Sequence, residues 1–338
     1  MLFMSVVAPP AEAGSTAGKW SVQKSGVEDD LLDVAFLNEK VGVAVGKHQT
    51  IVRTSDGGKT WKRVIERVKD GPELYAVIFA NDKLGYAITS VVGTILHTKD
   101  GGTTWVKTPI PDAFDVVPPA GHLATHAVHN SSYYYLCWGG SGSRLFKTEN
   151  AGRAWVEYKM KPEPSLGYGL AGIAFPDGRN GCLVNARASV PHNWAVTQDE
   201  GRTWGEQGKL DDKVDRGTGL HLQFVDKNHG WFLPTSGATI YATDNGGKTW
   251  TPQKIGDNTP TSMEKLHFAN AKIGHVLFDE PRIQDEAVWQ TADGGKTWRS
   301  LGKVSPPGYL HGLSFPSAQT GWVVGAKGYI ACYSGSGG

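Results

Sequence analysis

The chain has few cysteines and no excess of charge of either sign. Its three cysteines, Cys137, Cys182 and Cys332, show neither CxxC nor CxxCH spacing in 338 residues. This odd, scattered set excludes a disulfide framework, a thiolate zinc site of the usual spacing and covalently attached c-type haem. With 34 Lys and Arg against 33 Asp and Glu, the net charge is +1, so we expect no general electrostatic binding of nucleic acid. No apolar run reaches the length of a membrane-spanning helix.

Glycine and tryptophan are abundant, with 44 and 12 residues, and many of them belong to one repeated octet. The octet reads TSDGGKTW at 54–61, TDNGGKTW at 243–250 and TADGGKTW at 291–298, with variants at 98–105, 148–155 and 197–204. Its tryptophans recur every 44 to 50 residues. Repeats of this length that contain several short strands predict an all-β fold, the β-propeller, with one four-stranded sheet per blade.

The chemistry of the octet indicates a structural role. Its glycines supply the positive φ angles of a tight turn, and an Asp carboxylate accepts hydrogen bonds from that same turn. The indole anchors a seam between sheets, and we expect Trp to begin the outer strand of each blade. We therefore assign structural roles to the following residues: Asp56, Trp61, Asp100, Trp105, Asp199, Trp204, Asp244, Trp250, Asp293 and Trp298.

The two ends of the chain predict how the ring closes. After Trp298 a seventh period supplies three strands at 310–315, 321–325 and 328–333, and then lacks an octet. An orphan strand around Trp20 stands at the start and resembles the end of an octet. Pairing the two ends completes a seventh blade and leaves no open sheet edge between blades. We predict one seven-bladed propeller over 18–333, closed by its terminal strands.

The flanking segments predict export. Residues 1–17 contain a short apolar run followed by Ala11-Glu12-Ala13, a pattern typical of signal-peptide cleavage, although the basic start is missing. We interpret 1–17 as the remnant of a signal peptide and 334–338 as a flexible tail. The expected location is periplasmic, thylakoid-lumenal or extracellular, and the expected state is a monomer.

Six such octets, each ending a repeat of the general form L-x-x-V-x-F, G-W-x-V-G and T-x-D-G-G-K-T-W, resemble the Asp-box (BNR) propellers. Within them the chain resembles the photosystem II stability and assembly factor family, on 32–36 (LDVAF), Gly230-Trp231 and 321–325 (GWVVG) as well as the octets. The likeness runs from Trp20 to Tyr333, with departures in blades three, four and six. It implies an exported scaffold or assembly chaperone that binds a protein client, photosystem II being one such client.

Histidines are the main candidates for chemistry. His126, His221, His267 and His311 fall on the first strand of a period, which lines the axis of a propeller. Strict alternation points His221 and His267 to one face and His126 and His311 to the other. A metal site, if present, would use His221, His267 and His311, beside Asp33. The simpler interpretation is a wet polar channel, and we predict no cofactor.

Other functions remain as alternatives. A glycoside hydrolase would need two carboxylates across a groove, with Asp33, Glu264, Asp279 and Glu280 as candidates. The tryptophans also fit a carbohydrate-binding propeller. The sialidase arginine signature is absent. Our primary prediction is a non-catalytic scaffold that binds protein through the channel mouth, the loops and a proline-rich insertion at 109–121. The predicted binding residues are Asp33, Tyr133, Tyr134, Trp138, Arg187, His192, His221, Lys265, His267 and His311.

Overall fold

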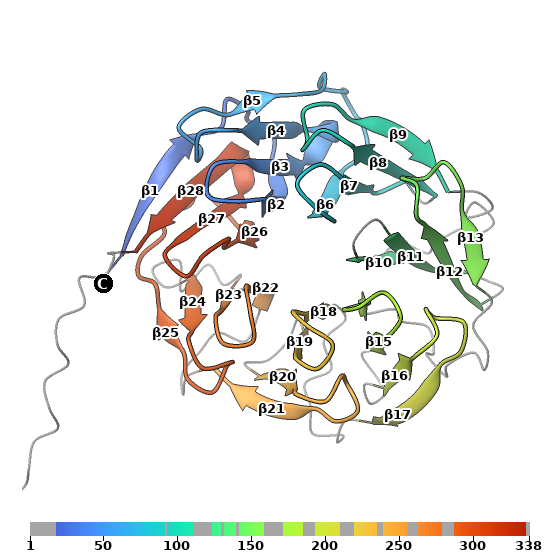
Figure 1. The fold of residues 1–338 in the computed structure, drawn as a ribbon. Helices are drawn as coiled ribbons and strands as arrows, with labels where there is room; N and C mark the ends of the chain where they lie inside the picture. Colours follow the sequence, from blue (N-terminus) through green and yellow to red (C-terminus); the bar gives the residue numbers. More distant parts are fainter. Residues whose placement is uncertain are drawn as a thin grey trace, which may run out of the picture.

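The structure, a computed structural model, is a ring of seven four-stranded antiparallel sheets (Figure 1). It describes residues 18–91, 93–110, 124–129, 132–139, 142–158, 172–184, 193–209, 220–234, 239–255, 263–278 and 287–335. Six sheets are built from four consecutive strands each, and the ribbon passes around the ring in sequence order (Figure 1). The predicted all-β, seven-bladed propeller is confirmed.

The strands of the first three blades have these bounds. Blade 1 contains β2 (Leu31–Phe36), β3 (Gly42–Gly46), β4 (Ile51–Thr54) and β5 (Lys62–Arg63). Blade 2 contains β6 (Leu74–Phe79), β7 (Gly85–Thr89), β8 (Thr94–Thr98) and β9 (Val106–Pro109). Blade 3 contains β10 (Ala124–His129), β11 (Ser132–Gly139), β12 (Gly142–Thr148) and β13 (Val156–Tyr158).

The remaining blades follow the same plan. Blade 4 contains β14 (Gly172–Ala174), β15 (Gly181–Val184), β16 (Asn193–Thr197) and β17 (Gly205–Lys209). Blade 5 contains β18 (Leu220–Phe224), β19 (Gly230–Pro234), β20 (Thr239–Thr243) and β21 (Thr251–Lys254). Blade 6 contains β22 (Met263–Phe268), β23 (Gly274–Phe278), β24 (Val288–Thr291) and β25 (Arg299–Ser300). Blade 7 contains β26 (Leu310–Ser314), β27 (Thr320–Gly325), β28 (Tyr329–Ser334) and β1 (Lys19–Lys24).

Closure of the ring is as predicted from the two ends of the chain. Strand β1 is the outer strand of blade 7 and pairs antiparallel with β28, from Lys19 opposite Ser334 to Lys24 opposite Tyr329. The Trp20 indole packs beside Phe315 and Tyr333, and its Nε1 donates to the carbonyl of Leu301 in blade 6 at 3.1 Å. The N-terminal strand therefore joins blade 7 to its neighbour.

Each octet forms a self-bonded turn between the third and fourth strands. In the first, Asp56 Oδ1 accepts from the Thr54 hydroxyl at 2.8 Å and from the Thr60 amide at 2.9 Å, while Oδ2 accepts from the Thr60 hydroxyl at 2.6 Å. These bonds lower the pKa of Asp56 to about 2. The carboxylate is thus committed to its own turn.

Two details of the octet prediction are wrong. The outer strands begin one residue after Trp, because the indole closes the turn instead; Trp105 Nε1, for example, donates to Gly102 O at 3.1 Å. In the fifth octet the turn residue is Asn245, not Asp244. Asn245 Oδ1 accepts from the Thr249 amide at 3.0 Å, whereas Asp244 is exposed. Asp244 stands one place too early to reach the turn amides.

The second glycine of the octet is required by packing between blades. A Cβ on Gly58, Gly102 or Gly201 would lie within 2.6 Å of a side chain in the preceding blade. All three glycines also have positive φ angles, which residues that carry a side chain rarely adopt. The first glycine is less constrained, since Ala151 and Glu200 take its place with positive φ in blades 3 and 4.

The core lies between the blades, where aromatic rings stack in a recurring way. Phe36 in blade 1 stacks on Trp322 in blade 7 with centroids 3.5 Å apart, and Phe268 in blade 6 stacks on Trp231 in blade 5 at 3.6 Å. In each pair the last residue of an inner strand meets the second strand of the preceding blade. The repeat therefore encodes the interface between blades as well as the blade itself.

Candidate functional site

The first strand of each sheet lies at the inner edge of the ring and lines its axis (Figure 1). Asp33 on β2 is only 3% exposed there. Its Oδ1 accepts from the Val34 amide at 2.8 Å, and its Oδ2 accepts from the Val77 amide in blade 2 at 3.0 Å. One carboxylate therefore joins the inner strands of blades 1 and 2.

Lys265 on β22 of blade 6 completes this arrangement. Its Nζ donates to Asp33 Oδ1, across the intervening inner strand of blade 7. That strand carries Gly312, where a Cβ would lie 2.8 Å from the Cα of Asp33, so a larger residue would push blades 7 and 1 apart. Two residues predicted separately as channel binders are thus one ion pair, and their charges neutralise each other.

The strict alternation that predicts the orientation of His311 does not hold, because the inner strand is not regular. The pairing of β26 with β27 shifts register between Leu310 and Gly312, which leaves His311 at a bulge. Strand β22 has the same shift around Glu264. His311 Nδ1 lies 3.8 Å from Glu264 Oε1. A bulge breaks strict alternation, and here it brings a histidine and a carboxylate of adjacent blades together.

Sequence reasoning missed a buried histidine. His275 on β23 is 0% exposed, stacks on Phe315 with centroids 3.6 Å apart, and stands opposite His267 in the register of β22 and β23. Gln290 Nε2 donates to His275 Nε2 at 2.8 Å, and neither histidine has a partner for Nδ1 within the described residues. Burial lowers the pKa of His267 to about 4, with a smaller effect from the charge of Lys265, and lowers that of His275 well below 6.5. Both imidazoles are therefore neutral at pH 7.

Other predicted binding residues are placed differently. Tyr133 and Tyr134 are 0% exposed, so they cannot serve as surface anchors. Tyr134 stacks on Phe175 of the next blade and donates its hydroxyl to Gly178 O at 2.9 Å, because the second strand of a blade faces the neighbouring sheet. Trp138 lies on β11 by its backbone. The predictions for Arg187, His192 and the 109–121 insertion fall largely outside the described residues.

His221 lies on inner strand β18 of blade 5, at the register position that Lys265 occupies on β22 of blade 6. The described residues contain no group of three or more His, Cys, Asp or Glu side chains placed to hold a metal ion. The candidate site for a metal at His221, His267 and His311 therefore stays a prediction.

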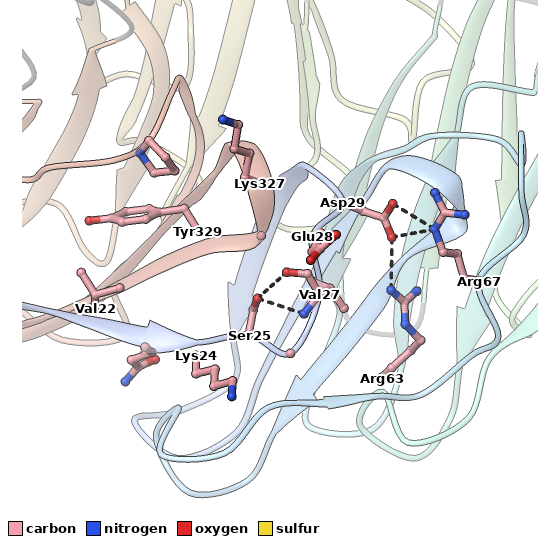
Figure 2. Close-up of a pocket in the computed structure, with 14 residues that line it drawn as sticks. Val22, Lys24, Ser25, Val27, Glu28, Asp29, Arg63, Arg67, Lys327 and Tyr329 are labelled. Atoms are coloured by element: carbon pink, nitrogen blue, oxygen red, sulfur yellow. Dashed lines mark hydrogen bonds and ion pairs between the residues drawn. The ribbon is translucent and has the colours of Figure 1, made fainter.

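A second cluster, also missed, lies where blade 7 meets blade 1. Asp29, with 8% of its side chain exposed, accepts from His48 Nδ1 at 2.8 Å, Thr50 Oγ1 at 2.8 Å, Arg63 Nη2 at 3.1 Å and Arg67 Nε at 3.1 Å. Although burial raises its pKa, these hydrogen bonds hold the pKa of Asp29 well below its usual range. Asp29 therefore fixes two guanidinium groups at the rim of the ring (Figure 2).

A cavity of about 720 Å³ opens beside Asp29 (Figure 2). We call it the seam groove. Its lining comes from the end of β1, the linker that follows, Arg63 and Arg67 of blade 1, and Pro307 and 327–329 of blade 7. It straddles the point where the N-terminal strand closes the ring.

Gln23, which also lines the groove, joins β1 to blade 1 and to β27 of its own blade. Its Oε1 accepts from the indoles of Trp61 and Trp322, each at 3.2 Å, and its Nε2 donates to Gly57 O at 3.0 Å. Gln253 makes the equivalent bond to Gly294 O at 3.2 Å in blade 6. The shared spacing Trp-x-x-Gln at 20–23 and 250–253 is a signal from which the sequence could have revealed this role.

Comparison with known proteins supports the resemblance drawn from the octets. A family model described as photosynthesis system II assembly factor YCF48 matches residues 13–156, and one described as sortilin, neurotensin receptor 3, matches 192–305. The photosystem II stability/assembly factor HCF136 of Arabidopsis thaliana is 24% identical over 82% of this chain and 81% of that protein. The photosystem II assembly lipoprotein Ycf48 of Synechococcus sp. (strain RCC307) is 26% identical over 80% of this chain and 89% of that protein.

A solved structure of YCF48 bound to D1 peptide is similar in fold, with a TM-score of 0.66 and 19% identity, over 98% of this chain and 100% of that one. The chain is an Asp-box repeat propeller that resembles the photosystem II stability and assembly factor family. No helix in the described part of the chain is long and apolar enough to cross a membrane.

Proposed function

We propose that this chain is an exported, non-catalytic scaffold that binds a protein client and aids the assembly or stability of a membrane or periplasmic complex. The observation that carries the proposal is likeness, over 80 to 82% of the chain, to proteins named as assembly factors. The similar YCF48 structure has a D1 peptide bound. Photosystem II is accordingly one candidate client.

The placement of the acidic side chains supports a binding role. The octet carboxylates bond to their own turns, as in Asp56, and Asp33 is neutralised by Lys265. Glycosidic bond cleavage needs one carboxyl group as acid and a second as base or nucleophile, both directed at substrate. Of the candidate acids, Asp33 is therefore committed to an ion pair, while Asp279 and Glu280 lie outside the described residues. The commitment of Asp33 and of the octet carboxylates favours a surface that binds another protein over a pair of catalytic acids.

An extracytoplasmic location is part of the proposal. Its support is the Ala-x-Ala pattern at 11–13 and the descriptions of the relatives, which are chloroplastic or lipoproteins. Fractionation of the native host tests this part: the protein should be recovered outside the cytoplasm, and recovery only in the cytoplasmic fraction would contradict it.

Capture from native membranes tests the binding role. The tagged protein is incubated with detergent-solubilised membranes of its host, and the bound proteins are identified by mass spectrometry against a tag-only control. We expect one defined membrane complex in stoichiometric amount. If nothing is retained beyond the control, the scaffold function is wrong.

A further inference from the structure

The seam groove carries an excess of positive charge. Its lining includes Lys24, Arg63, Arg67 and Lys327 against two carboxylates, Glu28 and Asp29. Asp29 is already bonded to both arginines, while the ammonium groups of Lys24 and Lys327 have no ion-pair partner among the described residues. Since the whole chain has a net charge of only +1, this excess is a local feature. It complements an acidic ligand.

The groove also adjoins an exposed strand edge. Strand β1 pairs with β28 on one side, and no described strand pairs with its other side. Its six residues make it the longest of the seven described outer strands, the others having two to five. Val22 near its end is 70% exposed. An unpaired edge with an exposed apolar residue is a template for an added strand.

The charges on this edge select among the strands that it can accept. Lys19 and Lys24 flank it and are exposed. Lysines on an edge repel a second copy of the same edge, which is how natural sheets avoid self-association. The same charges attract a strand that carries carboxylates. Charge complementarity therefore favours an acidic peptide over a second copy of this chain.

We propose that the seam groove and the β1 edge bind an extended acidic segment of the protein client. The segment adds to β1 as a strand through main-chain hydrogen bonds, an apolar side chain packs on Val22, and carboxylates contact Lys24 and Lys327 (Figure 2). Asp29 holds Arg63 and Arg67 beside this path. The inference rests on the proposed function, because it names the surface by which the scaffold holds its client.

Peptide titration tests the proposal directly. The probe is a fluorescein-labelled peptide of about ten residues that alternates Glu and Val, a length that spans β1 with its flanks, and its partner replaces every Glu by Gln. Binding is followed by fluorescence anisotropy on the whole chain. We expect the Glu peptide to bind at least about tenfold more tightly than the Gln peptide, with an affinity that falls as salt is raised.

The matched variants are Lys24→Glu/Lys327→Glu in the groove and Lys83→Glu/Lys272→Glu on exposed loops elsewhere. The groove variant should lose about tenfold or more in affinity for the Glu peptide, and the loop variant should bind like the wild type. Unchanged thermal melting of both variants verifies folding. Equal affinity of the groove variant and the wild type for the Glu peptide would overturn the proposal.

Two further outcomes would overturn it in favour of another occupant. One is concentration-dependent dimerisation that Val22→Lys abolishes, without peptide binding, since that assigns the edge to a second copy. The other is sedimentation with phosphatidylglycerol vesicles that Lys24→Glu/Lys327→Glu abolishes, again without peptide binding. Capture from native membranes distinguishes failure of the groove assignment from failure of the proposed scaffold function. If the groove variant retains the client as fully as the wild type, the scaffold function stands and the groove assignment is wrong; if the wild type retains nothing, the function itself is wrong.

Discussion

Loss of the Lys265 ammonium should destabilise the whole ring. In Lys265→Met the carboxylate of Asp33, 3% exposed, keeps its two backbone amide donors and loses its cationic partner. Removing one partner of a buried ion pair costs about 3 to 5 kcal/mol. Because the Lys265 side chain is 19% exposed, we expect the lower end, about 3 kcal/mol.

This cost converts to a measurable shift in melting temperature. With an unfolding entropy of about 2.1 cal/mol/K per residue, a ring of this size loses roughly 0.7 kcal/mol of stability per kelvin near its midpoint, so 3 kcal/mol corresponds to about 4 to 5 °C. Urea unfolding followed by tryptophan fluorescence and circular dichroism gives the free energy, and calorimetry gives the midpoint. Lys272→Met, an exposed lysine of the same blade, is the matched control and should change stability by less than about 0.5 kcal/mol.

The double variant Asp33→Asn/Lys265→Met distinguishes the stability contributed by the ion pair from the stability contributed by the packing of the two side chains. If the two residues act as one pair, the double variant should lose less than the sum of the single variants by at least about 1 kcal/mol. Strict additivity, or a Lys265→Met protein as stable as the control, would refute the argument that this pair joins blades 1, 2 and 6.

Three other predictions concern the octets, the closure and acid stability. Asp56→Ala should lower the melting temperature and leave client capture intact, while Asp244→Ala, outside the turn, should melt like the wild type; equal melting of the two would contradict the assigned turn roles. Gln23→Leu leaves the indole N–H groups of Trp61 and Trp322 unpaired and should lower the free energy of unfolding by about 2 to 3 kcal/mol. Amide hydrogen exchange in β1 should become faster than exchange in β2. If exchange in β1 is unchanged, Gln23 is not the contact that closes the ring. The pKa values of His267 and His275 in the folded chain lie below 6.5, so the unfolded chain binds more protons than the folded chain as the pH falls. The free energy of unfolding, measured with urea, should therefore decline from about pH 6.5 toward pH 4, by up to about 3 kcal/mol for His267. His267→Gln should flatten this decline, and a variant with the wild-type slope would show that another group titrates.

Most of the fold is predictable because its determinants are local and repeat. The octet specifies a turn through residues four apart, the glycines supply the positive φ angles, and the period counts the blades. The role of Asn245 is predictable as well, because Asn245 occupies the third octet position, where Asp56 stands in the first octet. Ring closure is predictable too, because three strands at one end and one at the other make a single sheet.

The candidate site is much less predictable, because it depends on contacts between blades. Asp33 and Lys265 are 232 residues apart in the sequence. They meet only because the ring brings blade 6 within reach of blade 1, and because the inner strand of blade 7 between them carries Gly312, which has no side chain. The bulge at His311 breaks the strict alternation that the sequence pattern alone predicts. Tyr133 and Tyr134 are candidate surface anchors in the sequence, but the preceding sheet covers Tyr133 and the next sheet covers Tyr134.

The sequence by itself determined the number of blades, their turns and the closing strand, since each depends on short-range hydrogen bonding and a regular repeat. The tertiary structure alone decided which charges are neutralised and which stay available. Asp29 and Asp33 are neutralised by partners from other segments, whereas Lys24 and Lys327 keep free ammonium groups at the seam. Whether a charge is neutralised depends on distances of a few ångströms between distant segments, and only the closed ring sets those distances.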